Sequence, residues 1–296
     1  MQVKLINYTQ NALETLLYTK NTRLQAAATI EDVKSWPEEK KLKELDYMLK
    51  TIQSSWEFVD YTFEITGVSR AFTHQFVRTR QGSYAQQSQR TVDMSEAFDF
   101  VMPASVNPLD DFSRSEDEIN HLLHVETIFN DFKDETERAY KELIKNNVAP
   151  QDARSILPTN TATNIIAKFD LRTLSDMAKK RLCTRTQGEY QEIFKAMKAA
   201  VVEVHPWAEK FIRVYCSAVG VCQFPNYKEC PIKPDIFNPD SGEKWRWTKD
   251  YQVPKNEIPL VEVGALFVER PATKDEIEAG YLKMKFEAKP LWKGNS

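Results

Sequence analysis

Glycine is scarce and scattered along this chain, and this limits the nucleotide-binding folds that it can adopt. The sequence of 296 residues contains only eight glycines, and no two of them lie within ten residues of each other. Dinucleotide-binding folds and P-loops need closely spaced glycines, because residues without a side chain let backbone amides approach a phosphate. The sequence therefore excludes both motifs. If the protein binds phosphate groups, side chains must supply the contacts.

The charge balance and the cysteine content narrow the class of protein further. Lysine and arginine number 40 against 43 aspartates and glutamates, a net charge of −3, whereas general nucleic-acid binders are usually basic. No run of roughly 18 apolar residues is present, and residues 1–17 lack the apolar stretch of a signal peptide. Four cysteines in a chain of this length indicate reduced thiols. We expect a cytoplasmic protein without a nucleic-acid or membrane partner.

Helical and strand patterns alternate along the chain, which predicts an α+β fold: a central antiparallel or mixed sheet flanked by helices. Spacing of apolar residues predicts helices over 37–50, 68–80, 110–142, 149–157, 171–183 and 187–215. Aromatic and β-branched runs predict strands over 56–65, 160–169 and 260–267. After Cys230 the composition becomes rich in Pro, Asp and Lys. We therefore expect a catalytic domain over 1–230 and a C-terminal appendage of unknown role over 231–296.

The chemistry is concentrated in residues 68–92. This window has no carboxylate, and its four arginines are Arg70, Arg78, Arg80 and Arg90. Between the last two arginines lies a segment rich in hydroxyl and amide side chains. Guanidinium groups and hydroxyls are suited to bind a nucleotide phosphate where glycine loops are lacking. From charge alone, a solvated basic face paired with the acidic helix 110–142 is an equal alternative.

The spacing of the motif resolves this choice. Arg78-Thr79-Arg80, seven residues and then Ser88 resemble the signature of the flavin-dependent thymidylate synthases, Arg-His-Arg, seven residues, Ser. Three further stretches resemble that family in the same order: ARSILP at 153–158, DLRTLSDMAKKRLCTRTQGE at 170–189, and the group Cys216, Gly220, Cys222 and Cys230. The resemblance runs from about residue 50 to residue 230.

The resemblance implies an enzyme that methylates C5 of the small nucleotide dUMP. The family takes a one-carbon unit from methylenetetrahydrofolate and reduces it with FAD, which NADPH has reduced. Uracil C5 is a poor nucleophile, so a cation against the N3/O edge is needed to stabilise an enolate-like form. The resemblance also implies a homotetramer whose active sites lie between subunits, which would bring separated arginine segments together.

Individual roles follow from the motif positions. Arg181 aligns with the arginine that activates uracil and is the expected catalytic residue. The expected FAD contacts are Ser54, Arg78, Thr79, Arg80, Gln86, Asp170, Arg172 and Asp176. The expected dUMP contacts are Gln75, Arg78, Gln86, Gln87, Ser88, Gln89, Arg90, Arg154 and Arg181.

Each assignment has a plainer alternative. Arg172 and Arg181 are also consistent with surface cations of a helix, and Ser88 with a turn hydroxyl. Cys183 is a possible nucleophile toward uracil C6, but a packed thiol fits its sequence context better. The later cysteines lack a close Cys-x-x-Cys pair, which favours structural thiols over a zinc site. We expect no metal.

The chain also departs from the family pattern, and several of the changes lie in one loop. Thr79 stands in place of the motif histidine, Ala85 and Gln86 stand where Asn and Glu are usual, and Phe58 replaces a frequent histidine. These changes leave two alternatives open: a sister enzyme that methylates or hydroxymethylates another pyrimidine nucleotide (UMP, dUMP or dCMP), and a non-catalytic paralogue that binds nucleotides or RNA. Retention of Arg181 favours a uracil ring, because cytosine has no acidic N3 proton.

Overall fold

The structure is a computed structural model of the full chain. The residues that it describes are 1–22, 29–51, 53–96, 98–106, 115–219, 222–224 and 230. By internal contacts the chain divides into two units, Met1–Val219 and Gly220–Ser296. The predicted appendage 231–296, with its strand at 260–267, lies outside the described residues. The predicted boundary near residue 230 therefore stays a prediction.

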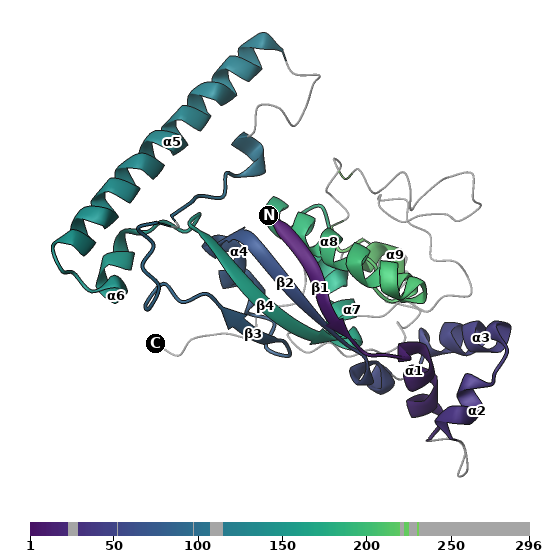
Figure 1. The fold of residues 1–296 in the computed structure, drawn as a ribbon. Coiled ribbons are helices and arrows are strands. Elements are labelled where there is room, and N and C mark those ends of the chain that lie inside the picture. Colours follow the sequence, from purple (N-terminus) through teal and green to yellow (C-terminus); the bar gives the residue numbers. More distant parts are fainter. Residues whose placement is uncertain are drawn as a thin grey trace, which may run out of the picture. The chain divides into compact units, whose positions relative to one another are not determined.

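A four-stranded antiparallel sheet organises the first unit (Figure 1). Its strands lie in the order β1 (Gln2–Tyr8), β2 (Asp60–Ser69), β4 (Ala162–Asp170) and β3 (Ser83–Gln86). Every neighbouring pair is antiparallel, with Ile65 opposite Ile165 and Tyr84 opposite Ala167. The α+β prediction is confirmed, and of the two predicted sheet types the described strands form the antiparallel one.

Strand β2 lies later in the chain than the sequence predicts. The pattern over 56–65 predicts a strand that Gly67 ends, but residues Gln53–Phe58 form a 3-10 helix, η1, and β2 continues to Ser69. The register of β2 against β4 shifts between Ile65 and Val68, and Gly67 has a φ of 64°. A glycine adopts this left-handed conformation without the strain of a side chain, so it forms a bulge instead of a strand end.

The described part of the chain also contains α-helices, some of which contact the sheet. They are α1 (Ala12–Asn21), α2 (Ile30–Lys34), α3 (Glu38–Met48), α4 (Arg70–Phe76), α5 (Glu116–Lys145), α6 (Pro150–Ala153), α7 (Leu171–Arg181), α8 (Gly188–Val204) and α9 (Tyr215–Val219). Short 3-10 turns also occur at η2 (Ala104–Val106), η3 (Arg154–Ile156) and η4 (Pro206–Lys210). The single predicted helix over 187–215 is wrong beyond Val204, because Pro206 cannot continue the helix and restricts the residue before it.

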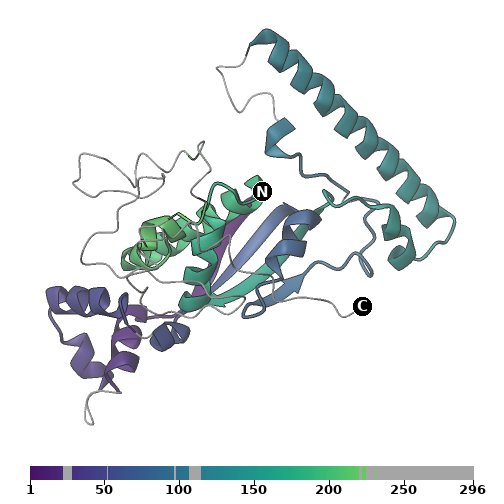
Figure 2. The same ribbon diagram turned by 180° about the vertical axis from the view of Figure 1, so that it is seen from behind.

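One face of the sheet forms the main core. Tyr61, Phe63 and Ile65 alternate along β2 with side chains that are less buried, and each of the three is fully buried. Helices α4, α7 and α8 contact the strands and one another, and Figure 2 shows α7 and α8 in green in front of the sheet. The buried side chains of β2 therefore face a layer of helices, and this layer carries the arginine motifs.

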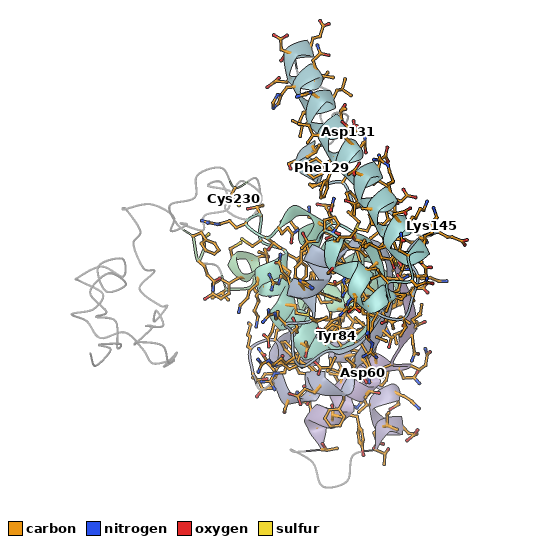
Figure 3. The ribbon with its side chains drawn as sticks, turned by 90° about the vertical axis from the view of Figure 1, so that its left-hand side faces the viewer. Asp60, Tyr84, Phe129, Asp131, Lys145 and Cys230 are labelled. Atoms are coloured by element: carbon orange, nitrogen blue, oxygen red, sulfur yellow. The ribbon has the colours of Figure 1, made fainter. Side chains whose placement is uncertain are left out.

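Helix α5 differs from the other helices because little of it is buried. Only Thr136 and Tyr140 of its 30 residues are buried, and both lie in its C-terminal half. Figure 3 shows Phe129 and Asp131 along the part of α5 that extends away from the sheet, and Lys145 at the other end. Of the predicted helix 110–142, residues 116–142 are helical, and the helix continues to Lys145. Within the described part of the chain, no helix is long and apolar enough to cross a membrane.

Candidate active site

A cavity of about 680 Å³ opens where η1, the turn after α4 and helix α7 meet. Small-molecule sites in proteins have volumes of roughly 300–1,000 Å³, so this cavity is large enough for a nucleotide-sized ligand. The residues that line it are Glu57, Arg78, Thr79, Gln81, Asp170, Arg172, Thr173, Asp176, Met177, Lys180 and Arg181. The lining thus combines two sequence motifs that are about ninety residues apart.

Helix α7 presents a polar stripe to the cavity. Its N-cap Asp170 accepts a hydrogen bond from the backbone amide of Thr173 at 2.6 Å, which satisfies one donor of the first turn. Arg172, Asp176 and Lys180 follow at intervals of four residues and lie on one side of the helix. The apolar side of α7 is buried in the core. Amphipathic spacing therefore fixes which side chains reach the cavity.

Charges of both signs line the cavity. Arg172 forms an ion pair with Glu57, and Asp176 accepts from Lys179 with an Nζ–Oδ1 distance of 2.7 Å. In each pair at least one side chain is about half exposed, so each ion pair contributes little to the stability of the fold. Across the whole lining, four cationic side chains face three acidic ones. An anionic ligand would thus meet a small excess of positive charge.

The turn after α4 brings the arginine motif to the same cavity. Ser69 caps the N-terminus of α4 by accepting from the amide of Phe72 at 3.0 Å, and the helix ends at Phe76. The amide of Thr79 then donates to the carbonyl of Phe76 at 3.2 Å. This tight turn places Arg78 and Thr79 in the cavity wall.

Tyr84 and Gly82 hold that turn in place. The Tyr84 hydroxyl lies 2.8 Å from the carbonyl oxygen of Thr79 and 3.0 Å from that of Phe76, so it can donate to either. Burial raises the pKa of Tyr84, so its hydroxyl stays a donor. A Cβ on Gly82 would lie 2.4 Å from the Phe169 ring, which explains why this position needs a glycine.

The predicted FAD contacts divide into two groups. Arg78, Thr79, Asp170, Arg172 and Asp176 line the cavity, and the predicted catalytic Arg181 lies in the same wall. The others do not line it in the described part of the chain: Ser54 and Arg80 are exposed, and the amide of Gln86 donates to the Thr73 hydroxyl at 2.9 Å.

Apart from Arg78 and Arg181, the predicted dUMP contacts do not line the cavity. Gln75 donates to Gln187, and the amide of Gln87 donates to the carbonyl of Asn164 at 3.0 Å. Ser88 accepts from the backbone amide of Arg90 at 3.2 Å. Of the rest, Arg90 and Arg154 are exposed and Gln89 is buried.

Arg154, one of these predicted dUMP contacts, lies near a further arginine, Arg70. Arg70 donates from Nη1 to the carbonyl of Gln87 at 3.4 Å, so it lies against the loop that follows β3. Burial lowers the pKa of Arg70, and the positive charge of Arg154 lowers it further. Two like charges held near each other favour binding of an anion between them. Arg70 was not among the predicted site residues, although the sequence window contained it.

The sequence prediction also missed part of the cavity wall. Lys180 lies one turn after Asp176, so its helical spacing was a usable signal. Glu57 carried no local signal, because it contacts Arg172 across 115 residues of sequence. Within the described part of the chain, no group of three His, Cys, Asp or Glu side chains is placed to bind a metal ion.

Residues 4–207 match the family described as thymidylate synthase complementing protein, or Thy1. The chain belongs to this family. A protein named flavin-dependent thymidylate synthase from Pyrococcus abyssi is 32% identical over 240 residues, 75% of this chain and 89% of that protein. Proteins of the same name are similar at 31% over 228 residues in Clostridium tetani (73% of this chain, 88% of that protein) and at 30% over 238 residues in Nitratidesulfovibrio vulgaris (75% and 90%).

Membership of the Thy1 family confirms the resemblance that the four motifs indicate. The departures from the family pattern can therefore be located in the structure, and two of them lie at or near the site. Thr79 is part of the cavity wall, and Gln86 is turned toward Thr73. In this Thy1 protein the positions of the usual histidine and glutamate are therefore occupied by neutral side chains.

Proposed function

We propose that this protein is a flavin-dependent thymidylate synthase. It methylates dUMP at C5, with methylenetetrahydrofolate as the carbon donor and NADPH as the source of electrons for FAD. The observation that carries the proposal is the composition of the cavity. Six residues chosen from two separate motifs, Arg78, Thr79, Asp170, Arg172, Asp176 and Arg181, line the same space. The names of the relatives point to the same chemistry.

The donor set of the cavity fits FAD. The pyrophosphate of FAD is anionic, and guanidinium groups pair with such groups in a planar, two-pronged manner. Arg78 and Arg172 would hold it, with Thr79 and Asp170 as further polar contacts. FAD, when bound, supplies the hydride that no side chain can supply. The residues of the chain bind and orient the two ligands and exclude water from the site.

Arg181 is the residue that acts on the pyrimidine. A positive charge against the N3/O edge of uracil stabilises negative charge there and increases electron density at C5. Arg181 lies in the cavity wall, where Glu57 pairs with Arg172 and Asp176 pairs with Lys179. Because these carboxylates pair with other cations, the Arg181 guanidinium is available to a nucleotide. Cytosine has no N3 proton to lose, so this arrangement supports a uracil ring.

The dUMP contacts outside the cavity are consistent with a site completed by a second copy of the chain. Leu123, Ile128 and Phe132 of α5 are about half exposed. Leu122, Val125, Phe129 and Phe132 follow the spacing of three and four residues that is typical of a helix–helix seam. These features support a homotetramer with active sites between subunits. Light scattering coupled to size exclusion tests it: a tetramer mass supports the proposal, and a monomer mass contradicts it.

A sister enzyme is the second candidate, and one observation favours it. Residue 86 is a glutamine, whose side-chain amide donates to Thr73, whereas the family usually has a carboxylate at this position. A missing charge beside the pyrimidine would alter proton transfer. A sister enzyme would methylate or hydroxymethylate another pyrimidine nucleotide. The third alternative is a paralogue without activity that binds nucleotides or RNA, and the net charge of −3 argues against its RNA-binding form.

Tritium release from dUMP labelled at C5 tests the proposal directly. With methylenetetrahydrofolate, FAD and NADPH, the full chain should release tritium, and mass spectrometry should identify dTMP. Arg181→Ala should reduce the rate to about 1% or less, since it removes the charge that activates uracil. A hydroxymethyl product, or turnover of UMP or dCMP alone, would support the sister enzyme. No release with any of these nucleotides would contradict both.

A further inference from the structure

The guanidinium of Arg181 lies over the aromatic ring of Tyr190. The carbon of its guanidinium lies 4.3 Å from the ring centroid of Tyr190, inside the distance of roughly 6 Å at which a cation and a ring face attract. Arg181 ends α7, whereas Tyr190 lies in the first turn of α8. The contact thus joins two helices through one side chain of the active site.

The ring of Tyr190 is itself fixed. It is fully buried, and it meets the edges of Phe72 and Phe76 with centroid distances of 5.0 Å and 5.8 Å. Phe76 in turn packs against the rings of Tyr84 and Phe169. A ring held in such a cluster has few alternative rotamers, so it provides a rigid surface for the guanidinium.

The Tyr190 hydroxyl is not needed to hold the ring. Within the described part of the chain, this buried hydroxyl has no well-aligned hydrogen bond, although the side chains of Thr79 and Arg181 lie near it. Burial raises the pKa of Tyr190, while the charge of Arg181 and polar contact with the Thr79 and Arg181 side chains lower it, so the group stays neutral at physiological pH. A phenylalanine would preserve the ring face and remove only the hydroxyl, which has no well-aligned hydrogen bond. The aromatic face is therefore the part of Tyr190 that acts on Arg181.

We propose that Tyr190 is a positioning residue for the reaction: its ring face holds the Arg181 guanidinium at the cavity wall. An interaction through the ring face uses no N–H group, so it leaves Arg181 donors for the uracil edge, and Arg181 has five N–H groups in all. The inference rests on the proposed function, in which Arg181 contacts the pyrimidine. It adds a residue from outside the cavity lining and outside the four family motifs.

Substitutions at Tyr190 separate the ring from the hydroxyl. In the full chain loaded with FAD, Tyr190→Leu should lower kcat about 10- to 30-fold, because the guanidinium loses its support. Tyr190→Phe should stay within about threefold of the unchanged protein. A matched control is Phe194→Leu, one turn further along α8 and also buried, which should leave kcat within about twofold. Thermal denaturation checks that all variants are folded.

Coupling to Arg181 distinguishes positioning from a general loss of packing. Equilibrium binding of dUMP, measured by calorimetry, should weaken about tenfold in Tyr190→Leu, but less than about twofold when Tyr190→Leu is made in an Arg181→Gln background, which has no cation to place over the ring. Independent effects, equal losses in Tyr190→Leu and Phe194→Leu, or a Tyr190→Phe loss as large as that of Tyr190→Leu would each overturn the inference. If the unchanged protein binds dUMP but does not turn it over, the proposed function fails and the binding cycle still decides the role of Tyr190.

Discussion

Glu189 connects α8 to the start of α4 through hydrogen bonds, and replacing it tests how much this connection stabilises the fold. Its carboxylate accepts from the Ser69 backbone amide at 2.7 Å and from the Ser69 hydroxyl, across 120 residues of sequence. Ser69 is 3% exposed and caps α4, the helix that precedes Arg78. Glu189 lies in the first turn of α8. The carboxylate thus fixes the start of α4 against the start of α8.

The magnitude follows from what Glu189→Ala leaves behind. Hydrogen bonds to a charged group are each worth about 1.5–3 kcal/mol, and a buried donor without a partner costs about 1–3 kcal/mol. The two bonds share one carboxylate, so we expect a loss of about 3 kcal/mol in the free energy of unfolding. Glu189→Gln keeps one acceptor oxygen, and its loss should be about 1 kcal/mol.

Urea denaturation, followed by circular dichroism at one fixed protein concentration, measures both losses. Glu192→Ala is the matched control, because Glu192 lies on the same helix and pairs with Lys195 at 2.7 Å in an exposed position. We expect the control to change the free energy of unfolding by less than about 0.5 kcal/mol. If Glu189→Ala costs no more than this control, the anchoring role assigned to Glu189 is refuted.

Three other perturbations test separate parts of the structure. Gly82→Ala should cost about 1–3 kcal/mol of stability in a thermal melt, because the new Cβ would lie 2.4 Å from a buried ring; Gly188→Ala, with nothing within 4 Å, should cost nothing, and equal melting temperatures would contradict the packing. Burial lowers the pKa of His205, with the charge of Glu14 opposing it, so the folded state binds fewer protons than the unfolded state. Stability that is present above about pH 6.5 should therefore be lost progressively as the pH falls below that value; a His205→Gln variant should show a flatter profile, and an unchanged slope would refute the assignment. Arg172→Ala should weaken FAD binding about tenfold or more in a fluorescence titration, whereas unchanged affinity would exclude Arg172 from the cofactor site.

Local patterns were enough to predict the helix that carries the charged cavity wall. In α7 the four-residue spacing of Arg172, Asp176 and Lys180 defines one face, and Asp170 is a typical N-cap. The same spacing did not reveal where α8 ends, because Pro206 was outweighed by the apolar pattern that continues past it. Similarly, Gly67 was interpreted as a strand end, although a bulge fits a glycine equally well.

Contacts between distant residues were not predictable in this way. The pairing of Glu57 with Arg172 depends on how η1 lies against α7, and the stacking of Tyr190 under Arg181 depends on the start of α8. Neither Glu57 nor Tyr190 belongs to a charged or polar pattern in its own segment. Tyr190 in particular follows the apolar spacing of α8, so the sequence indicates only a core residue.

The central claim is that the cationic cavity binds a flavin beside a pyrimidine nucleotide through Arg181. The absorbance spectrum of the FAD-loaded protein, recorded before and after addition of dUMP, tests this claim most directly. We predict a bound flavin band that dUMP shifts in the unchanged protein, and a bound band that dUMP leaves unshifted in Arg181→Ala. A protein that binds no FAD, or a dUMP-induced shift that persists undiminished in Arg181→Ala, would contradict the account.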